Sequence, residues 1–160
     1  MSGALTIRPA TPADNVAISG VHQSAIRGLC KTHYDARTVE VWAASRTPEL
    51  YERVLESHDV FVAERDGKVV AFGQLDLESG AIHAVYVAPD AARTGVGQAM
   101  LSYLEDVAKL HGWPKVHLVA TLNALPFCEA MGYEQVAPFT YQVGSDVMVE
   151  CVDMRKVLPR

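Results

Sequence analysis

The chain has 160 residues, of which 49% are hydrophobic and 21% are charged. This length and composition predict one folded domain over residues 1–160 and exclude a disordered tail. Lys and Arg number 14 against 19 Asp and Glu, and the net charge of −5 contains no block of like charge. Binding to nucleic acid or to an anionic membrane is therefore not expected, because both need a clustered basic face.

The three cysteines, Cys30, Cys128 and Cys151, are far apart, odd in number and without metal-ligand spacing. They are typical of reduced thiols, and no metal is expected. Residues 1–15 contain no apolar core of signal-peptide length, and no window approaches a membrane span. These features predict a soluble, cytoplasmic protein.

The first part of the chain alternates one strand with helices. Residues 5–8 alternate apolar and polar side chains, as in a short strand that Pro9 ends. Thr11 before Pro12 is a helix start, and apolar spacing continues that helix to Leu29.

Residues 30–37 show no period and are expected to form a loop. Thr38 is expected to cap a short helix, and Thr47-Pro48 to begin another. Such an aperiodic loop, with its polar and aromatic groups, is a place where substrate contacts are often found.

Three strands follow in an antiparallel meander. Residues 60–64 and 69–77 are strand-like and flank Asp66-Gly67, a typical hairpin pair. Residues 81–87, reading AIHAVYV, form the third strand.

A glycine loop joins this third strand to a helix. Gly95-Val96-Gly97 precedes apolar positions at helical spacing up to Leu110. Free backbone N–H groups and the positive end of a helix dipole thus meet at one point, which predicts an anion site, most simply for a phosphate. The loop lacks the third glycine of a dinucleotide site and the Gly-Lys-Ser/Thr of a P-loop.

The remaining elements complete a mixed sheet. Gly112 ends the helix, and strand 116–120 is expected to lie parallel to strand 81–87 because a helix crossover connects them. A short helix over 125–131 precedes a hairpin of strands 133–143 and 147–157. We therefore expect a single α/β domain whose sheet is mixed.

The order of these motifs resembles that of the GCN5-related N-acetyltransferase (GNAT) superfamily, in its small-molecule-acetylating type. The resemblance runs from Leu5 to Leu158. It rests on the meander, Tyr-Val-x-Pro, Gly-x-Gly on a helix, Ala-x-Pro-Phe and Met-Gly-Tyr. It implies the GNAT fold, with a parallel strand pair around a coenzyme A loop, and acetyl-CoA as cosubstrate.

The resemblance also implies which residues hold the cofactor. Ala92 stands where the family usually has Arg or Gln, but the loop's backbone donors remain. A backbone N–H near Val85 to Val87 would stabilise the oxyanion. The implied cofactor-binding residues are Val85, Tyr86, Val87, Ala92, Arg93, Thr94, Gly95, Val96, Gly97, Gln98, Thr121, Asn123 and Phe127.

Three residues are candidates for catalysis. Strand alternation places His83 on one face with Val85 and Val87, and Ile82 on the other face with Ala84 and Tyr86. His83 titrates near neutrality and is the candidate base, with Asp76 as the next candidate; a purely structural His83 is the alternative. Cys128 stands where the family usually has the Tyr that protonates the leaving sulfur. Cys128 could be that acid, another hydroxyl could substitute, or the thiolate could leave unaided; Cys128 as a covalent nucleophile is the rival mechanism.

The acceptor side is expected around residues 25–42. Arg27, His33 and Tyr34 are the candidate substrate-binding residues, whereas Trp42 is expected to pack as core. The expected activity is direct acetyl transfer to the primary amine of a small molecule. Acetylation of a protein lysine or N-terminus, an acyl-CoA sensor with little turnover, and a homodimeric state remain open.

Overall fold

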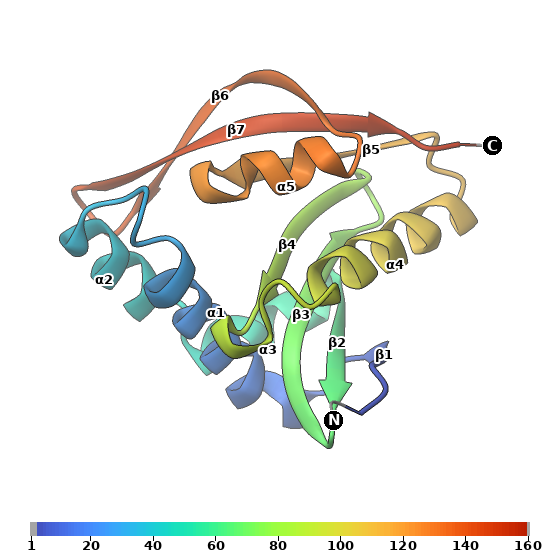
Figure 1. The fold of residues 1–160 in the computed structure, drawn as a ribbon, viewed down its shortest axis with the longest axis horizontal. Helices are drawn as coiled ribbons and strands as arrows, with labels where there is room; N and C mark the ends of the chain where they lie inside the picture. Colours follow the sequence, from blue (N-terminus) through green and yellow to red (C-terminus); the bar gives the residue numbers. More distant parts are fainter. Residues whose placement is uncertain (1–2, 160) are drawn as a thin grey trace.

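The computed structural model describes residues 3–159, which form a seven-stranded sheet with helices on both faces (Figure 1). The strand order is β1-β2-β3-β4-β5-β7-β6. The strands are β1 (Thr6–Pro9), β2 (Asp59–Arg65), β3 (Lys68–Asp76), β4 (Ala81–Val87), β5 (Lys115–Thr121), β6 (Glu134–Val143) and β7 (Val147–Val157). The helices are η1 (Pro12–Asp14), α1 (Asn15–Leu29), α2 (Ala36–Ala44), α3 (Pro48–Ser57), η2 (Pro89–Ala91), α4 (Val96–Leu110), η3 (Leu122–Ala124) and α5 (Leu125–Ala130).

Consecutive residues of the central strands pack in two separate hydrophobic cores. Ala71 packs with Met100 and Leu104 of α4, whereas its neighbour Phe72 packs with Ile18 of α1 and Tyr51 of α3. Side chains of a strand alternate between the faces of its sheet, so α4 covers one face and α1 and α3 cover the other. Helix α2 packs against β7 in a third cluster.

The expected meander and mixed sheet are confirmed. The pairs β2–β3 and β3–β4 are antiparallel, and β4–β5 is parallel. Asp66 and Gly67 have φ of 56° and 75°, the left-handed geometry of a two-residue hairpin turn. None of the helices in residues 3–159 has the length and apolar character to cross a membrane.

One helix boundary differs from the sequence-based expectation. The sequence predicts Thr38 as a helix cap, but α2 begins at Ala36 and its cap is Asp35, whose carboxylate accepts the Thr38 N–H at 2.7 Å. Aspartate is as good an N-cap as threonine, and the absence of apolar spacing before Thr38 hides the first turn.

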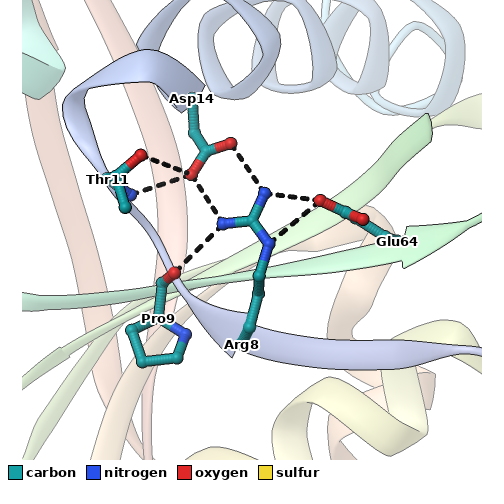
Figure 2. Close-up of polar contacts among 5 residues, drawn as sticks. All are labelled: Arg8, Pro9, Thr11, Asp14 and Glu64. Carbon is teal, nitrogen blue, oxygen red and sulfur yellow. Dashed lines mark hydrogen bonds and ion pairs between the residues drawn. The ribbon is translucent and has the colours of Figure 1, made fainter. Parts of the chain in front are cut away.

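An ion-pair cluster ties the first strand to the rest of the fold (Figure 2). Arg8 on β1 donates to both oxygens of Asp14, at 2.8 and 2.9 Å, and through Nε to Glu64 of β2 at 3.0 Å. Asp14 also accepts the backbone N–H of Thr11 at 2.8 Å, which closes the start of η1. The cluster thus joins β1, η1 and β2.

Candidate active site

A cleft opens where β4 and β5 part. The two strands pair only at Ala81↔His117 and Ile82↔Leu118, and beyond those pairs they diverge. The side chains along the cleft come from β4, β5, α4 and α5 and include His83, Val85, Tyr86, Thr121, Phe127 and Cys128. The backbone edge of β4 that faces β5 therefore has donors and acceptors that β5 does not take up.

The glycine loop borders this cleft at the start of α4. Gly95 is the N-cap of α4 with φ of 85°, and Arg93 also has a positive φ of 63°. The first hydrogen bond of the helix runs from Ala99 N–H to Gly95 O at 3.0 Å. The N–H groups of the first turn, which contains Gly97, thus have no partner in the helix and are free to bind an anion.

Gly97 lies close to the cleft wall. A Cβ at this position would be 3.5 Å from Phe127 Cζ and 3.5 Å from Val87 Cγ2, both ordinary contacts. The loop and the cleft are therefore contiguous: an anion at the helix start and a chain lying along β4 can belong to one ligand.

The expected alternation along β4 is wrong at its start. The β3–β4 register passes from Gln74↔Ala84 to Leu75↔Ile82, so His83 is the extra residue of a β-bulge. Ile82 consequently packs in the α4-side core with Val85 and Val87 instead of sharing a face with Ala84 and Tyr86. A bulge redirects side chains in a way that a period of two cannot predict.

The bulge brings His83 to the opposite face, beside two other polar side chains. The His83 ring stacks on that of His58, with 4.7 Å between the ring centroids and 6° between the planes. Oδ2 of Asp76 lies 4.0 Å from His83 Nε2 and 3.8 Å from His58 Nε2. Sequence reasoning missed His58, because only the packing of α3 on the sheet brings it to β3 and β4.

The electrostatics of this cluster favour a neutral His83 and an ionised Asp76. Burial, together with the neighbouring His58, lowers the pKa of His83. The pKa of Asp76 is lowered mainly by the Glu78 N–H, and also by the Ser79 hydroxyl, which donate to its two oxygens at 3.0 Å each. A neutral imidazole beside a carboxylate can accept a proton and hold it as a stabilised ion pair.

Cys128 lines the other wall of the cleft and is buried. Burial, reinforced by the charge of Glu129, raises the pKa of the Cys128 thiol to about 11. The thiol is therefore protonated near neutral pH: it has a proton to donate, and it lacks the thiolate character of a nucleophile.

The other candidate cofactor residues after β5 lie in different places. Thr121, at the end of β5, and Phe127, on α5, line the cleft. Asn123 is not part of the lining; it lies near Cys30 and partly offsets the burial that raises the pKa of the Cys30 thiol.

The three candidate acceptor residues have different partners. Arg27 donates to Glu40 of α2 at 2.8 Å, and His33 is exposed beside Thr32. The Tyr34 hydroxyl donates to the Glu150 carbonyl at 2.6 Å and accepts the Leu122 N–H at 2.9 Å. Tyr34 thus joins the loop after α1 to β7 and to the end of β5.

Comparison with known sequences identifies relatives of this chain. A model of the acetyltransferase (GNAT) family matches residues 27–133. An uncharacterized N-acetyltransferase of Methanocaldococcus jannaschii is 29% identical over 142 residues, which are 81% of this chain and 61% of that protein. The chain thus spans less than two thirds of the length of that relative.

Solved structures share the fold over the whole domain. A GCN5-related N-acetyltransferase from Rhodopseudomonas palustris superposes with a TM-score of 0.91 at 24% identity, covering 99% of this chain and 98% of that one. The PaiA N-acetyltransferase of Thermoplasma acidophilum, solved in complex with coenzyme A, has a TM-score of 0.79 at 16% identity, with 96% and 99% covered.

Proposed function

Because this chain belongs to the acetyltransferase (GNAT) family, we propose that it transfers the acetyl group of acetyl-CoA directly to the primary amine of a small molecule. The observation that carries the proposal is the divergence of β4 from β5 immediately beside the glycine loop. An anion site next to an unpaired strand edge suits a ligand that has a pyrophosphate and an amide-containing arm.

The cofactor would lie along β4. The N–H groups of residues 93–98, at the end of the loop and the start of α4, would bind the pyrophosphate, with the side chain of Arg93 as a nearby positive charge. The pantetheine amides would pair with the open edge of β4, in the manner of an added strand. This path would bring the thioester into the cleft, near His83 and Cys128.

The transfer would proceed in one displacement. The amine nitrogen forms a bond to the thioester carbonyl carbon, a backbone N–H of β4 between Val85 and Val87 stabilises the oxyanion, and the C–S bond then breaks. The amine proton passes to His83, directly or through water, and Asp76 stabilises the imidazolium. Coenzyme A leaves as a thiolate or takes a proton from Cys128.

Two bridges link elements on the expected acceptor side, and they support a small molecule over a polypeptide. Tyr34 binds both Glu150 and Leu122, as described above. Arg37 on α2 pairs with Asp146, in the turn between β6 and β7, at 2.7 Å. These contacts join the α1–α2 segment to the hairpin that lies beside it in Figure 1. A polypeptide acceptor would need this side of the cleft to be open.

The oxidation state of the three cysteines is evidence about the cellular compartment of the protein. Cys30, Cys128 and Cys151 are all free and buried. Unpaired cysteines support the proposal of a reducing compartment, the cytoplasm.

The experiment is a release assay for free coenzyme A with acetyl-CoA and a panel of small amines, lysine peptides and peptides with free N-termini. We expect release with at least one small amine and none with the peptides. His83→Gln should lower kcat/KM by about 10²-fold or more, because a general base contributes that much, while leaving the Kd for acetyl-CoA unchanged.

Two results would contradict the proposal. Turnover of peptides alone would assign the chain to protein acetylation. Tight binding of acetyl-CoA without release for any acceptor would favour an acyl-CoA sensor, an alternative that the departures at Ala92 and Cys128 motivate.

A further inference from the structure

Three potential metal ligands converge on the α3-covered face of the sheet. His58 follows the last residue of α3, Asp76 ends β3, and His83 is the bulged residue of β4. One donor atom from each lies within 4.8 Å of the other two. Two imidazoles and one carboxylate are a donor set that zinc and similar divalent transition metals prefer.

The backbone is shaped to bring these groups together. Without the bulge, the period of two along β4 would keep His83 on the same face as Val85, away from Asp76. The bulge instead places His83 against His58. An irregularity that turns one side chain toward two other ligands is typical of a functional site.

Neighbouring groups also fix two of these ligands, Asp76 and His58, by hydrogen bonds. Glu78 N–H donates to Oδ1 of Asp76, and the Ser79 hydroxyl donates to Oδ2, each at 3.0 Å. The side-chain amide of Gln74 lies 2.8 Å from His58 Nδ1 through its nitrogen; a metal on Nε2 requires the proton to sit on Nδ1, and the Gln74 amide, when flipped, presents its oxygen to accept that proton. The opposite nitrogen, Nε2, faces Asp76. Such outer contacts are what orient the ligands of a metal site.

We propose that His58, Asp76 and His83 bind one divalent transition-metal ion of the zinc class. The separations of 3.8 and 4.0 Å between Asp76 Oδ2 and the two Nε2 atoms require each donor to move by less than an ångström to reach bonding distance. The stacked rings must turn toward the ion, a rotation about a soft torsion.

The ion would have an open coordination position. The His83 side chain is 45% exposed, so water or a substrate group can reach the metal. The ion would occupy the Nε2 lone pair of His83. If the proposed acetyl transfer uses that lone pair to accept the amine proton, bound metal inhibits the enzyme; this consequence rests on the proposed function, whereas the site itself does not.

The test is calorimetric titration of the EDTA-treated, desalted protein with zinc chloride, repeated with cobalt chloride and visible absorption. The parent should bind one ion per chain. His58→Phe, which keeps a ring against His83, and Asp76→Asn, which keeps a hydrogen-bond acceptor, should each bind at least about tenfold more weakly. His111→Ala is the matched control, because His111 is an exposed histidine at the end of α4, and it should bind like the parent.

The proposal is overturned if the parent shows no saturable binding at one equivalent, or if both His58→Phe and Asp76→Asn retain parental affinity. If His58→Phe fails to fold by circular dichroism, Asp76→Asn alone decides. The metal titration contains neither acetyl-CoA nor an acceptor. Failure to bind metal would therefore not contradict the proposed acetyl transfer, and failure of the release assay would not contradict the metal site.

Discussion

At the scale of single residues, Cys128 is the clearest departure from the family pattern. It lines the cleft where the resemblance implies a tyrosine, and its raised pKa of about 11 keeps it protonated. A thiol is shorter than a phenol, and the thiolate of coenzyme A, with an ordinary thiol pKa of ~8.5, needs little help to leave. Cys128 is thus positioned to donate a proton to the leaving sulfur. We do not expect the reaction to require that proton.

We accordingly expect Cys128→Ala to lower kcat by less than about tenfold, with Cys128→Ser as the variant that keeps a proton donor of similar size. Steady-state rates of coenzyme A release measure the effect. A loss of about 10²-fold or more in Cys128→Ala, restored by Cys128→Ser, would assign the residue an essential acid role.

Asp14 is a residue whose charge contributes to stability. Its hydrogen bonds to Arg8, and the Thr11 N–H, lower its pKa against the opposing effect of burial. A carboxyl with a lower pKa in the folded state stabilises the fold at pH values above its unfolded pKa of ~3.9, and this contribution is lost as the pH falls through the folded pKa.

Asp14→Asn should therefore reduce the free energy of unfolding by about 2 kcal/mol at pH 7, since hydrogen bonds to a charged group are lost. Urea denaturation at pH 7 and at pH 3 measures it. The difference between variant and parent should shrink at pH 3, and a difference that stayed constant or grew would contradict this role of Asp14.

His83 shows how far single residues can be read from the sequence. Its identity as the histidine of its strand is evident there, but the direction of its side chain is not, because the bulge at Gln74/Leu75 comes from the pairing of two strands. His58 could not be linked to it at all, since no local pattern places a residue after α3 beside β4. Local periodicity predicts a face only while the ladder is regular.

At the scale of elements, the segment after α1 is held by contacts that span the chain. Tyr34 bonds to Glu150, 116 positions later, and to Leu122, 88 positions later. The sequence indicates an aperiodic loop with aromatic residues, and the loop is there; which of its side chains face the cleft depends on these long-range contacts. The Tyr34 hydroxyl both donates and accepts a hydrogen bond within the protein, so it holds the loop on β7.

Tyr34→Phe removes that hydroxyl and leaves the Leu122 N–H without its partner. We expect a loss of about 1–3 kcal/mol in the free energy of unfolding, measured by chemical denaturation. The Kd for coenzyme A should stay within a few-fold of the parent. Unchanged stability would show that the bridge does not hold the loop.

The glycine loop is the element that the sequence predicts best. Gly95 adopts the left-handed conformation that caps α4, and the strand, loop and helix follow each other as expected. Glycine turns and helix periodicity are determined by the local sequence, so the predictions made from them agree with the structure. The helix begins at Val96, which places Gly97 within its first turn rather than in the loop.

At the scale of the whole molecule, the architecture is a mixed sheet that opens at one place. The antiparallel meander and the C-terminal hairpin are held by long ladders with single register shifts, whereas β4 and β5 share two residue pairs. The parallel order could be predicted from the helix crossover, but the early end of the pairing could not, because no local sequence pattern marks where two strands stop pairing. In the proposed function, that opening and the glycine loop would form the two ends of one cofactor site.

Anion binding at the first turn of α4 is what the proposed function depends on above all, and Gly97 tests it most directly. A Cβ at this position would meet Phe127 and Val87 at 3.5 Å, so Gly97→Ala fits without strain, whereas Gly97→Asp adds a negative charge at the proposed pyrophosphate site. In calorimetric titration with coenzyme A, we predict that Gly97→Ala binds within a few-fold of the parent and that Gly97→Asp, folded by circular dichroism, binds about a hundredfold more weakly or not at all. Parental affinity in Gly97→Asp would contradict the assignment of this loop as the cofactor site.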